Sequence, residues 1–180
     1  MRVGSLGLSI VLLYAPACLG AGKPPRAEEV LAAARERATE QHKNILVIFS
    51  ASWCEPCREL EAFLDSSHIN PIIAKHFVIA RLTTAEEFGG NPKLNTPGAE
   101  RLILKLGGVL GSLPFFAFLN PNGELIINSR RPVKNKADSG NIGFPTEPDE
   151  IDWFMIMLKK GAPTLTVDDE HVIGTSLRNN

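Results

Sequence analysis

The sequence predicts an α/β fold in which a central mixed sheet is flanked by helices, and three observations carry this prediction. Residues 45–50 form a continuous apolar run rich in β-branched side chains, which is typical of a strand buried on both faces of a sheet. A charged, helix-favouring stretch, 55–66, follows after a short turn. Residues 115–119 and 124–128 are separated by Asn-Pro-Asn-Gly and therefore predict an antiparallel hairpin.

The remaining elements are predicted from composition and periodicity. Residues 77–82 are a further strand, and four more stretches favour helix: 26–42, 70–76, 99–106 and 147–160. The first of these adds an extra helix at the N-terminus. A long polar loop, 129–145, precedes the last helix, and the tail 161–180 is weakly patterned, with a short element expected at 167–173.

The length of the chain favours a single globular domain, and its charge gives no indication of nucleic-acid binding. The chain has 180 residues, which is enough for a sizeable core, and its formal net charge of -1 shows no basic excess. We find no internal repeat. We therefore expect a single domain over 23–180, with its core at about 42–160.

The first 22 residues predict export. Arg2 is the only charged residue before Lys23, and an apolar run from Leu6 to Tyr14 is followed by small residues. A charged start, a short apolar core and a small-residue end are typical of a secretory signal peptide. The run is shorter than the ~20 apolar residues that a membrane span needs. A retained anchor or a cytosolic terminus is the alternative.

Cys18 lies within this predicted signal peptide, and a lipid anchor attached to it after export is one interpretation of this cysteine. Ala17 fits the cleavage pattern of a bacterial lipoprotein, whereas Ala15 and Pro16 fit it poorly. The simpler interpretation is a small apolar residue that is discarded with the signal.

Two cysteines, Cys54 and Cys57, lie at the junction between the first predicted strand and the helix after it. A helix N-terminus leaves backbone N–H groups unsatisfied and carries partial positive charge, so a thiolate placed there is stabilised and reactive. Pro56 has a fixed φ and no N–H, which suits the first turn of a helix. The pair can therefore hold two electrons as a disulfide and pass them on by exchange.

A structural disulfide or a metal site is the alternative role for this pair. A zinc site usually needs four ligands, and the sequence has no second CxxC motif. The four histidines are scattered and are expected at the surface: His42, His68, His76 and His171. We therefore expect neither a metal nor a bound cofactor.

The sequence resembles the thioredoxin family over roughly residues 42–160. The segment Ala-Ser-Trp-Cys-Glu-Pro-Cys-Arg at 51–58 looks like the family's active site. About sixty residues later, Gly-Ser-Leu-Pro-Phe at 111–115 looks like the family's cis-proline loop, and an apolar strand and a turn follow it. Over its whole length the chain resembles exported bacterial members of this type, which also carry a long loop before the last helix.

The resemblance implies a thioredoxin fold and a periplasmic thiol–disulfide oxidoreductase that needs no cofactor. Cys54 is then the more exposed nucleophile, which attacks a substrate disulfide, and Cys57 is the buried cysteine that resolves the mixed disulfide. The implied supporting or substrate-docking residues are Trp53, Glu55, Pro56, Leu113 and Pro114. The implied partners are protein disulfides or dithiols and an electron donor or acceptor protein, which can be membrane-bound. A core-filling tryptophan and a trans proline are the alternatives at positions 53 and 114.

Two departures from the family pattern bear on the chemistry. Thioredoxin has a buried acid in the strand before the motif, where this chain has Ile48, so proton handling must come from elsewhere, with Glu55, Glu59 and water as candidates. Glu55 stands where thioredoxin has glycine, and an acidic neighbour disfavours a thiolate. A strong oxidase needs that thiolate stabilised, so we predict a reduction potential nearer the reducing end, with Arg58 offsetting part of the effect. The alternative function is a binding module whose cysteines form a structural disulfide.

Overall fold

The computed structural model describes residues 24–132 and 140–179. The predicted signal peptide, with Cys18, therefore lies outside the described residues, as does the middle of the predicted long loop, 133–139. Within the described part of the chain, no helix combines the length and the apolar character needed to cross a membrane.

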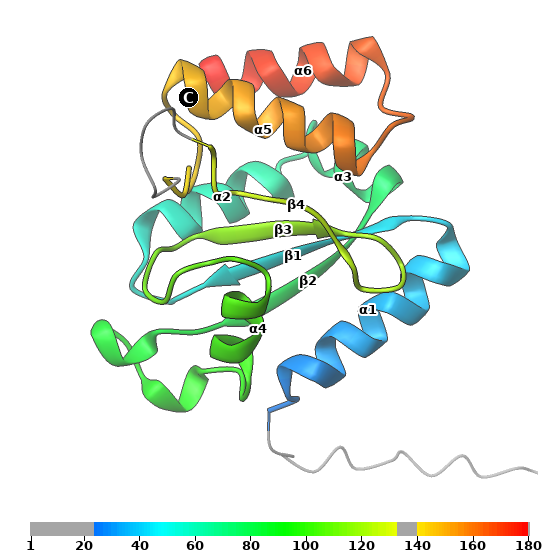
Figure 1. The fold of residues 1–180 in the computed structure, drawn as a ribbon. Coiled ribbons are helices and arrows are strands. Elements are labelled where there is room, and N and C mark those ends of the chain that lie inside the picture. The colour runs from blue at the N-terminus through cyan, green and yellow to red at the C-terminus, as the bar shows by residue number, and fades with distance from the viewer. Residues whose placement is uncertain (1–23, 133–139, 180) are drawn as a thin grey trace, which may run out of the picture.

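A four-stranded mixed sheet lies at the centre of the domain (Figure 1). Its strands are β1 (Asn44–Ser50), β2 (Phe77–Thr83), β3 (Phe115–Leu119) and β4 (Leu125–Asn128), in the order β2-β1-β3-β4. β1 is parallel to β2 and antiparallel to β3, which in turn is antiparallel to β4. The predicted strands and hairpin are confirmed. β1, the strand that leads to the cysteines, is hydrogen-bonded to a neighbour on each side.

Helices pack on both faces of this sheet (Figure 1). One face carries α1 (Ala27–Gln41), the predicted extra helix, and α4 (Ala99–Lys105). The other face carries α2 (Glu55–Asp65), α3 (Asn70–His76), α5 (Pro148–Gly161) and α6 (Val167–Arg178). The mixed sheet flanked by helices confirms the predicted fold class.

The apolar run of β1 explains why the domain has two cores. Ile45, Val47 and Phe49 belong to the cluster under α1 and α4, whereas Leu46 and Ile48 belong to the cluster under the other four helices. Successive side chains of a strand point to opposite faces of the sheet, so a continuous apolar strand supplies both clusters. This double burial anchors the strand that leads to Cys54 and Cys57.

The tail beyond α5 is more ordered than its pattern indicated. α6 covers Val167–Arg178, whereas only a short element was expected at 167–173. Thr166 caps the helix, since its Oγ1 accepts from the N–H of Asp169 (3.1 Å), and the Asp169 carboxylate accepts from the N–H of Thr166 (3.4 Å). The buried face of α6 contains Gly174, which weakens the apolar periodicity and hides the helix from a pattern search.

The expectation that His76 lies at the surface is wrong. His76 is the last residue of α3, and it is only 8% exposed. The segment between α5 and α6 covers it, with Thr164 Oγ1 3.4 Å from Nδ1 of the imidazole. Burial depends here on the tail, which the sequence pattern left unassigned. Desolvation and the neighbouring Lys75 lower the pKa of His76 from its ordinary value.

The described ends of the predicted long loop are packed against the domain. Ile142 and Phe144 are buried, and the Phe144 ring lies 5.9 Å from the ring of Phe63 on α2. Arg130 and Asn141 form an isolated antiparallel bridge. The polar composition of this stretch predicted only a loop, whereas its described ends pack against the domain and run beside the loop before β3.

Candidate active site

The two cysteines form a disulfide at the start of α2. Cys54 is the residue that precedes the first helical position, and Cys57 lies in the first turn, with 5.2 Å between the two Cα atoms. Glu55 and Pro56 are the first two residues of the helix, and both are exposed. Because β1 ends at Ser50, only a short turn separates the sheet from the cysteine pair at the N-terminus of the helix.

Both cysteine residues are buried in this oxidised form. Cys54 is 3% exposed and Cys57 is 2% exposed, so the expectation of a clearly more exposed Cys54 is wrong for the disulfide. Ala51 and the two cysteines form a small cluster, and Leu113 packs against it. The covering side chain comes from a loop nearly sixty residues away in the sequence, which local reasoning could not place.

The loop before β3 brings the predicted docking residues to the disulfide. Leu113 is half-buried against the cysteine cluster, and Pro114, the next residue, is buried. The Leu113–Pro114 peptide bond is cis. The sequence-predicted pairs Cys54–Cys57 and Leu113–Pro114 are thus brought together in one place.

Asn141 holds this loop in place, a role that the sequence reasoning did not assign to it. Its Nδ2 donates to the carbonyl oxygens of Ser112 (3.2 Å) and Pro114 (2.9 Å). Its Oδ1 accepts from Oγ of Ser129 (2.6 Å), a fully buried residue whose Oγ accepts from the N–H of Phe116 (3.1 Å). The long loop thereby fixes the backbone on both sides of Leu113.

Trp53 lies at the edge of the site rather than in the core. It is 36% exposed, and its Nε1 donates to the carbonyl oxygen of Ala85 (2.8 Å). Its ring meets that of Phe88 edge-on, with 6.5 Å between the ring centroids, and Phe88 is itself 67% exposed. An exposed aromatic surface therefore borders the disulfide.

Glu86 is a buried acid that accepts hydrogen bonds from Ser52, two residues before Cys54, and the sequence reasoning missed it. Glu55 and Glu59, which were expected to handle protons, are both exposed on α2. Glu86 instead is 0% exposed and accepts from Ser52 through both the backbone N–H (2.6 Å) and Oγ (2.7 Å). Burial on its own raises the pKa of Glu86, but the hydrogen bonds from Ser52 and Asn91 outweigh it and lower the pKa.

No simple sequence signal could have selected Glu86 from its neighbour Glu87. The two acids are adjacent after β2, and only the fold shows that Glu86 is buried whereas Glu87 is exposed. In the described part of the chain, no group of three or more histidine, cysteine or acidic residues is arranged to hold a metal ion.

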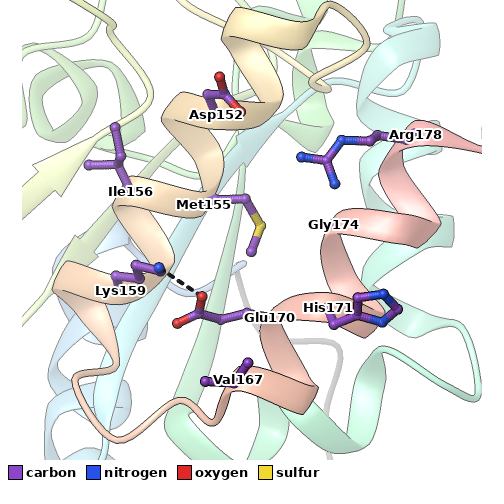
Figure 2. Close-up of a pocket in the computed structure, with 9 residues that line it drawn as sticks. All are labelled: Asp152, Met155, Ile156, Lys159, Val167, Glu170, His171, Gly174 and Arg178. Atoms are coloured by element: carbon purple, nitrogen blue, oxygen red, sulfur yellow. Dashed lines mark ion pairs between the residues drawn. The ribbon is translucent and has the colours of Figure 1, made fainter.

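A cavity of about 530 Å³ lies away from the disulfide, between α5 and α6 (Figure 2). Figure 2 shows Met155 directed into the space between the two helices, with an ion pair between Lys159 and Glu170 (2.8 Å) across it. None of its lining residues belongs to the cysteine motif, to the loop before β3 or to Glu86. The candidate active site is therefore the disulfide itself and its border.

Comparison with known proteins agrees with this geometry. A sequence model of the family described as Thioredoxin-like matches residues 26–121, more than half of the chain. Tryparedoxin from Trypanosoma brucei brucei is 27% identical over 113 residues, which cover 57% of this chain and 78% of that protein.

Two solved structures also align with the chain. One is the disulphide isomerase from Xylella fastidiosa Temecula1, with a TM-score of 0.46, 21% identity, and coverage of 67% of this chain and 80% of that one. The other is the C-terminal domain of DsbD from Neisseria meningitidis in its oxidised form, with a TM-score of 0.45, 16% identity, and coverage of 76% and 99%.

The family match and the disulfide geometry together decide the chemical class. The matched region contains both the Cys54–Cys57 pair at the helix N-terminus and the Leu113–Pro114 loop that covers it. A pair in this setting exchanges disulfides with thiols of other molecules. The chain belongs to the thioredoxin-like family and is a thiol–disulfide oxidoreductase.

Proposed function

We propose that this protein is exported and reduces disulfide bonds in other proteins, with Cys54 as the nucleophile and Cys57 as the resolving cysteine. The observation that carries the proposal is the position of the pair: Cys54 immediately precedes α2, and Cys57 lies one turn into it. The partial positive charge of the helix N-terminus acts most strongly on the sulfur at its entrance.

The reaction follows from this arrangement in two exchanges. In the reduced protein, the Cys54 thiolate attacks one sulfur of a client disulfide, and the other client sulfur leaves as a thiolate. Cys57 then attacks the Cys54 sulfur, which releases the client as a dithiol and forms the Cys54–Cys57 disulfide. Two electrons pass from the pair to the client. A donor protein must supply them again, which in an exported protein suits a membrane-bound partner.

The electrostatics at the turn support the reducing direction. Glu55 occupies the first position of α2, so a carboxylate stands beside Cys54 and opposes the effect of the helix N-terminus. The Arg58 guanidinium, which could offset it, donates to the carbonyl oxygen of Ser52 (3.2 Å). A strong oxidase depends on a strongly stabilised thiolate, and Glu55 weakens the stabilisation that the helix N-terminus and Arg58 supply.

The border of the disulfide supports docking of an extended client chain. Trp53 presents an exposed aromatic surface on one side of the pair, and Leu113 and Pro114 lie on another. The client backbone then lies along the loop before β3, and Pro56 keeps the first turn of α2 in the conformation that presents the pair.

Export is proposed from the signal-like pattern of residues 1–22, with the periplasm as the compartment and a lipid anchor at Cys18 as the alternative to a free protein. Loss of processing after mutation of the small-residue segment 15–22 would support cleavage of a signal. Incorporation of a labelled fatty acid at Cys18 would instead assign the anchor.

A trapping experiment tests the assignment of the two cysteines. We expect Cys57→Ser to accumulate mixed disulfides with client proteins, because the first exchange occurs and the second cannot. Cys54→Ser should trap none. Equal behaviour of the two variants, together with a pair that resists reduction in the unchanged protein, would favour the alternative of a binding module stabilised by a structural disulfide.

A further inference from the structure

Glu86 is a fully buried acid to which the proposed reaction assigns no role. It begins a short turn, Glu86–Phe88, that follows β2. Its carboxylate accepts from the Ser52 N–H (2.6 Å), the Ser52 hydroxyl (2.7 Å) and the Asn91 N–H (3.2 Å). Among the residues that the structure describes, no lysine, arginine or histidine forms an ion pair with it.

These hydrogen bonds connect Glu86 to the active-site turn. Ser52 lies two residues before Cys54, and the intervening Trp53 donates its Nε1–H to the carbonyl oxygen of Ala85 (2.8 Å). Both residues that lead into Cys54 are therefore held by the neighbouring pair Ala85–Glu86. The Cα atoms of Ser52 and Cys54 are separated by at most about 7 Å, because two virtual bonds of the chain join them.

The carboxylate is ionised at neutral pH and accepts three hydrogen bonds. Its hydrogen bonds favour the charged form more than burial disfavours it, which lowers the pKa of Glu86 below its ordinary value. Its lone pairs accept from three donors among the described residues, so it is poorly suited to carry protons. What it does supply is a fixed negative charge, and a charge in a buried position is screened much less by salt than one at the surface.

We propose that Glu86 is a positioning residue of this oxidoreductase, whose buried carboxylate anchors the Ser52–Cys54 turn and whose negative charge disfavours the Cys54 thiolate. The inference rests on the proposed function and adds a second source of the reducing character assigned to Glu55. The charge reaches the turn from the segment after β2, whereas the acid of thioredoxin would lie in β1 at the position of Ile48.

The thiol chemistry of Cys54 tests the charge directly. In the chain carrying Cys18→Ser and Cys57→Ser, Cys54 is the only thiol, and its rate of alkylation by iodoacetamide follows the thiolate fraction. We expect Glu86→Gln to move the midpoint of the pH profile to lower pH and to raise the rate at neutral pH by about threefold to tenfold. Glu87→Gln is the matched control, because Glu87 is exposed and solvent-screened, and it should leave the profile unchanged.

A second variant separates the charge from the structural anchor. Ser52→Ala removes one hydrogen bond from the carboxylate but keeps its charge, so the midpoint of Cys54 should stay where it is or rise. If Ser52→Ala lowers the midpoint of the Cys54 pH profile as much as is expected for Glu86→Gln, then loosening the turn is enough to lower that midpoint. The role of the charge would then be refuted. This arm can refute the role of the charge even where Glu86→Gln does not fold. An unchanged midpoint in a folded Glu86→Gln protein would equally overturn the proposal.

The reduction potential adds a readout that a merely structural role does not produce. With Cys54 and Cys57 both present, Glu86→Gln should raise the potential mainly at alkaline pH, where the thiolate is populated, by up to about 30 mV for each tenfold gain in thiolate. A shift of equal size at pH 6 and pH 9 would contradict an effect of charge. If the pair of the unchanged protein cannot be reduced at all, the proposed function fails, whereas the single-thiol measurement still tests Glu86.

Discussion

The contact between Asn141 and the loop before β3 leads to a quantitative prediction, for the variant Asn141→Ala. The substitution removes two donations from Nδ2, to Ser112 and Pro114, and the acceptance from Ser129. A hydrogen bond contributes about 1 kcal/mol net, and Ser129 is fully buried, so its hydroxyl would also lose its acceptor. We expect the free energy of unfolding to fall by about 2–3 kcal/mol, which is about 5–10 °C in Tm for a domain of this size.

Urea unfolding of the oxidised protein, followed by circular dichroism, measures this loss. Asn122→Ala is the matched control, since Asn122 is exposed in the turn between β3 and β4. Asn141→Asp keeps the shape and the acceptor for Ser129 while removing both donors, so it should be destabilised as well. Because Asn141 holds the backbone around Leu113, the exchange rate with a protein disulfide should fall more than the rate with glutathione. A loss in Asn141→Ala no larger than in Asn122→Ala would refute this reasoning.

Two further measurements follow from the site and the core. Titration of the Cys54–Cys57 pair in glutathione buffers should give a reduction potential near the thioredoxin value of about -270 mV, and a value near the -120 mV or so of strong oxidases would contradict the proposed direction. His76 has a lowered pKa in the folded protein, so the unfolded chain binds more protons just below the ordinary histidine pKa of about 6.5. Stability should therefore decrease as the pH falls through that value toward the lower folded pKa, and His76→Asn should show a shallower decrease over the same window. Identical pH slopes of unfolding free energy in the two proteins would show that another group is responsible.

The redox pair could be predicted from sequence because the elements that position it are adjacent in the chain. A strand, a turn, two cysteines two residues apart and a helix are adjacent in the chain, so propensity and helix capping define the setting of Cys54 and Cys57. The strands and helices around the pair follow from the same kind of local pattern, with β1 confirmed almost to the residue.

The residues that surround the pair could not be predicted in this way. Ser52 and Glu86 are 34 residues apart, and Asn141 lies 27 residues from Pro114. Nothing in the composition of the segments around Glu86 and Asn141 distinguishes them from solvated loops. The tertiary structure reveals them: Glu86 is buried and half-buried Asn141 lies beside the loop before β3, and the hydrogen-bond partners of the two belong to the residues before Cys54 and to that loop.

The sequence by itself determined the chemistry of this protein: a dithiol at a helix N-terminus, carried by a strand that is apolar on both faces. Only the tertiary structure decided how that dithiol is covered, held and charged. Leu113 covers the disulfide, Asn141 holds the covering loop, and Glu86 brings a buried carboxylate to the turn. The physical reason is that covalent neighbours specify secondary structure, whereas burial, desolvation and hydrogen bonds between distant segments exist only once the two cores have formed.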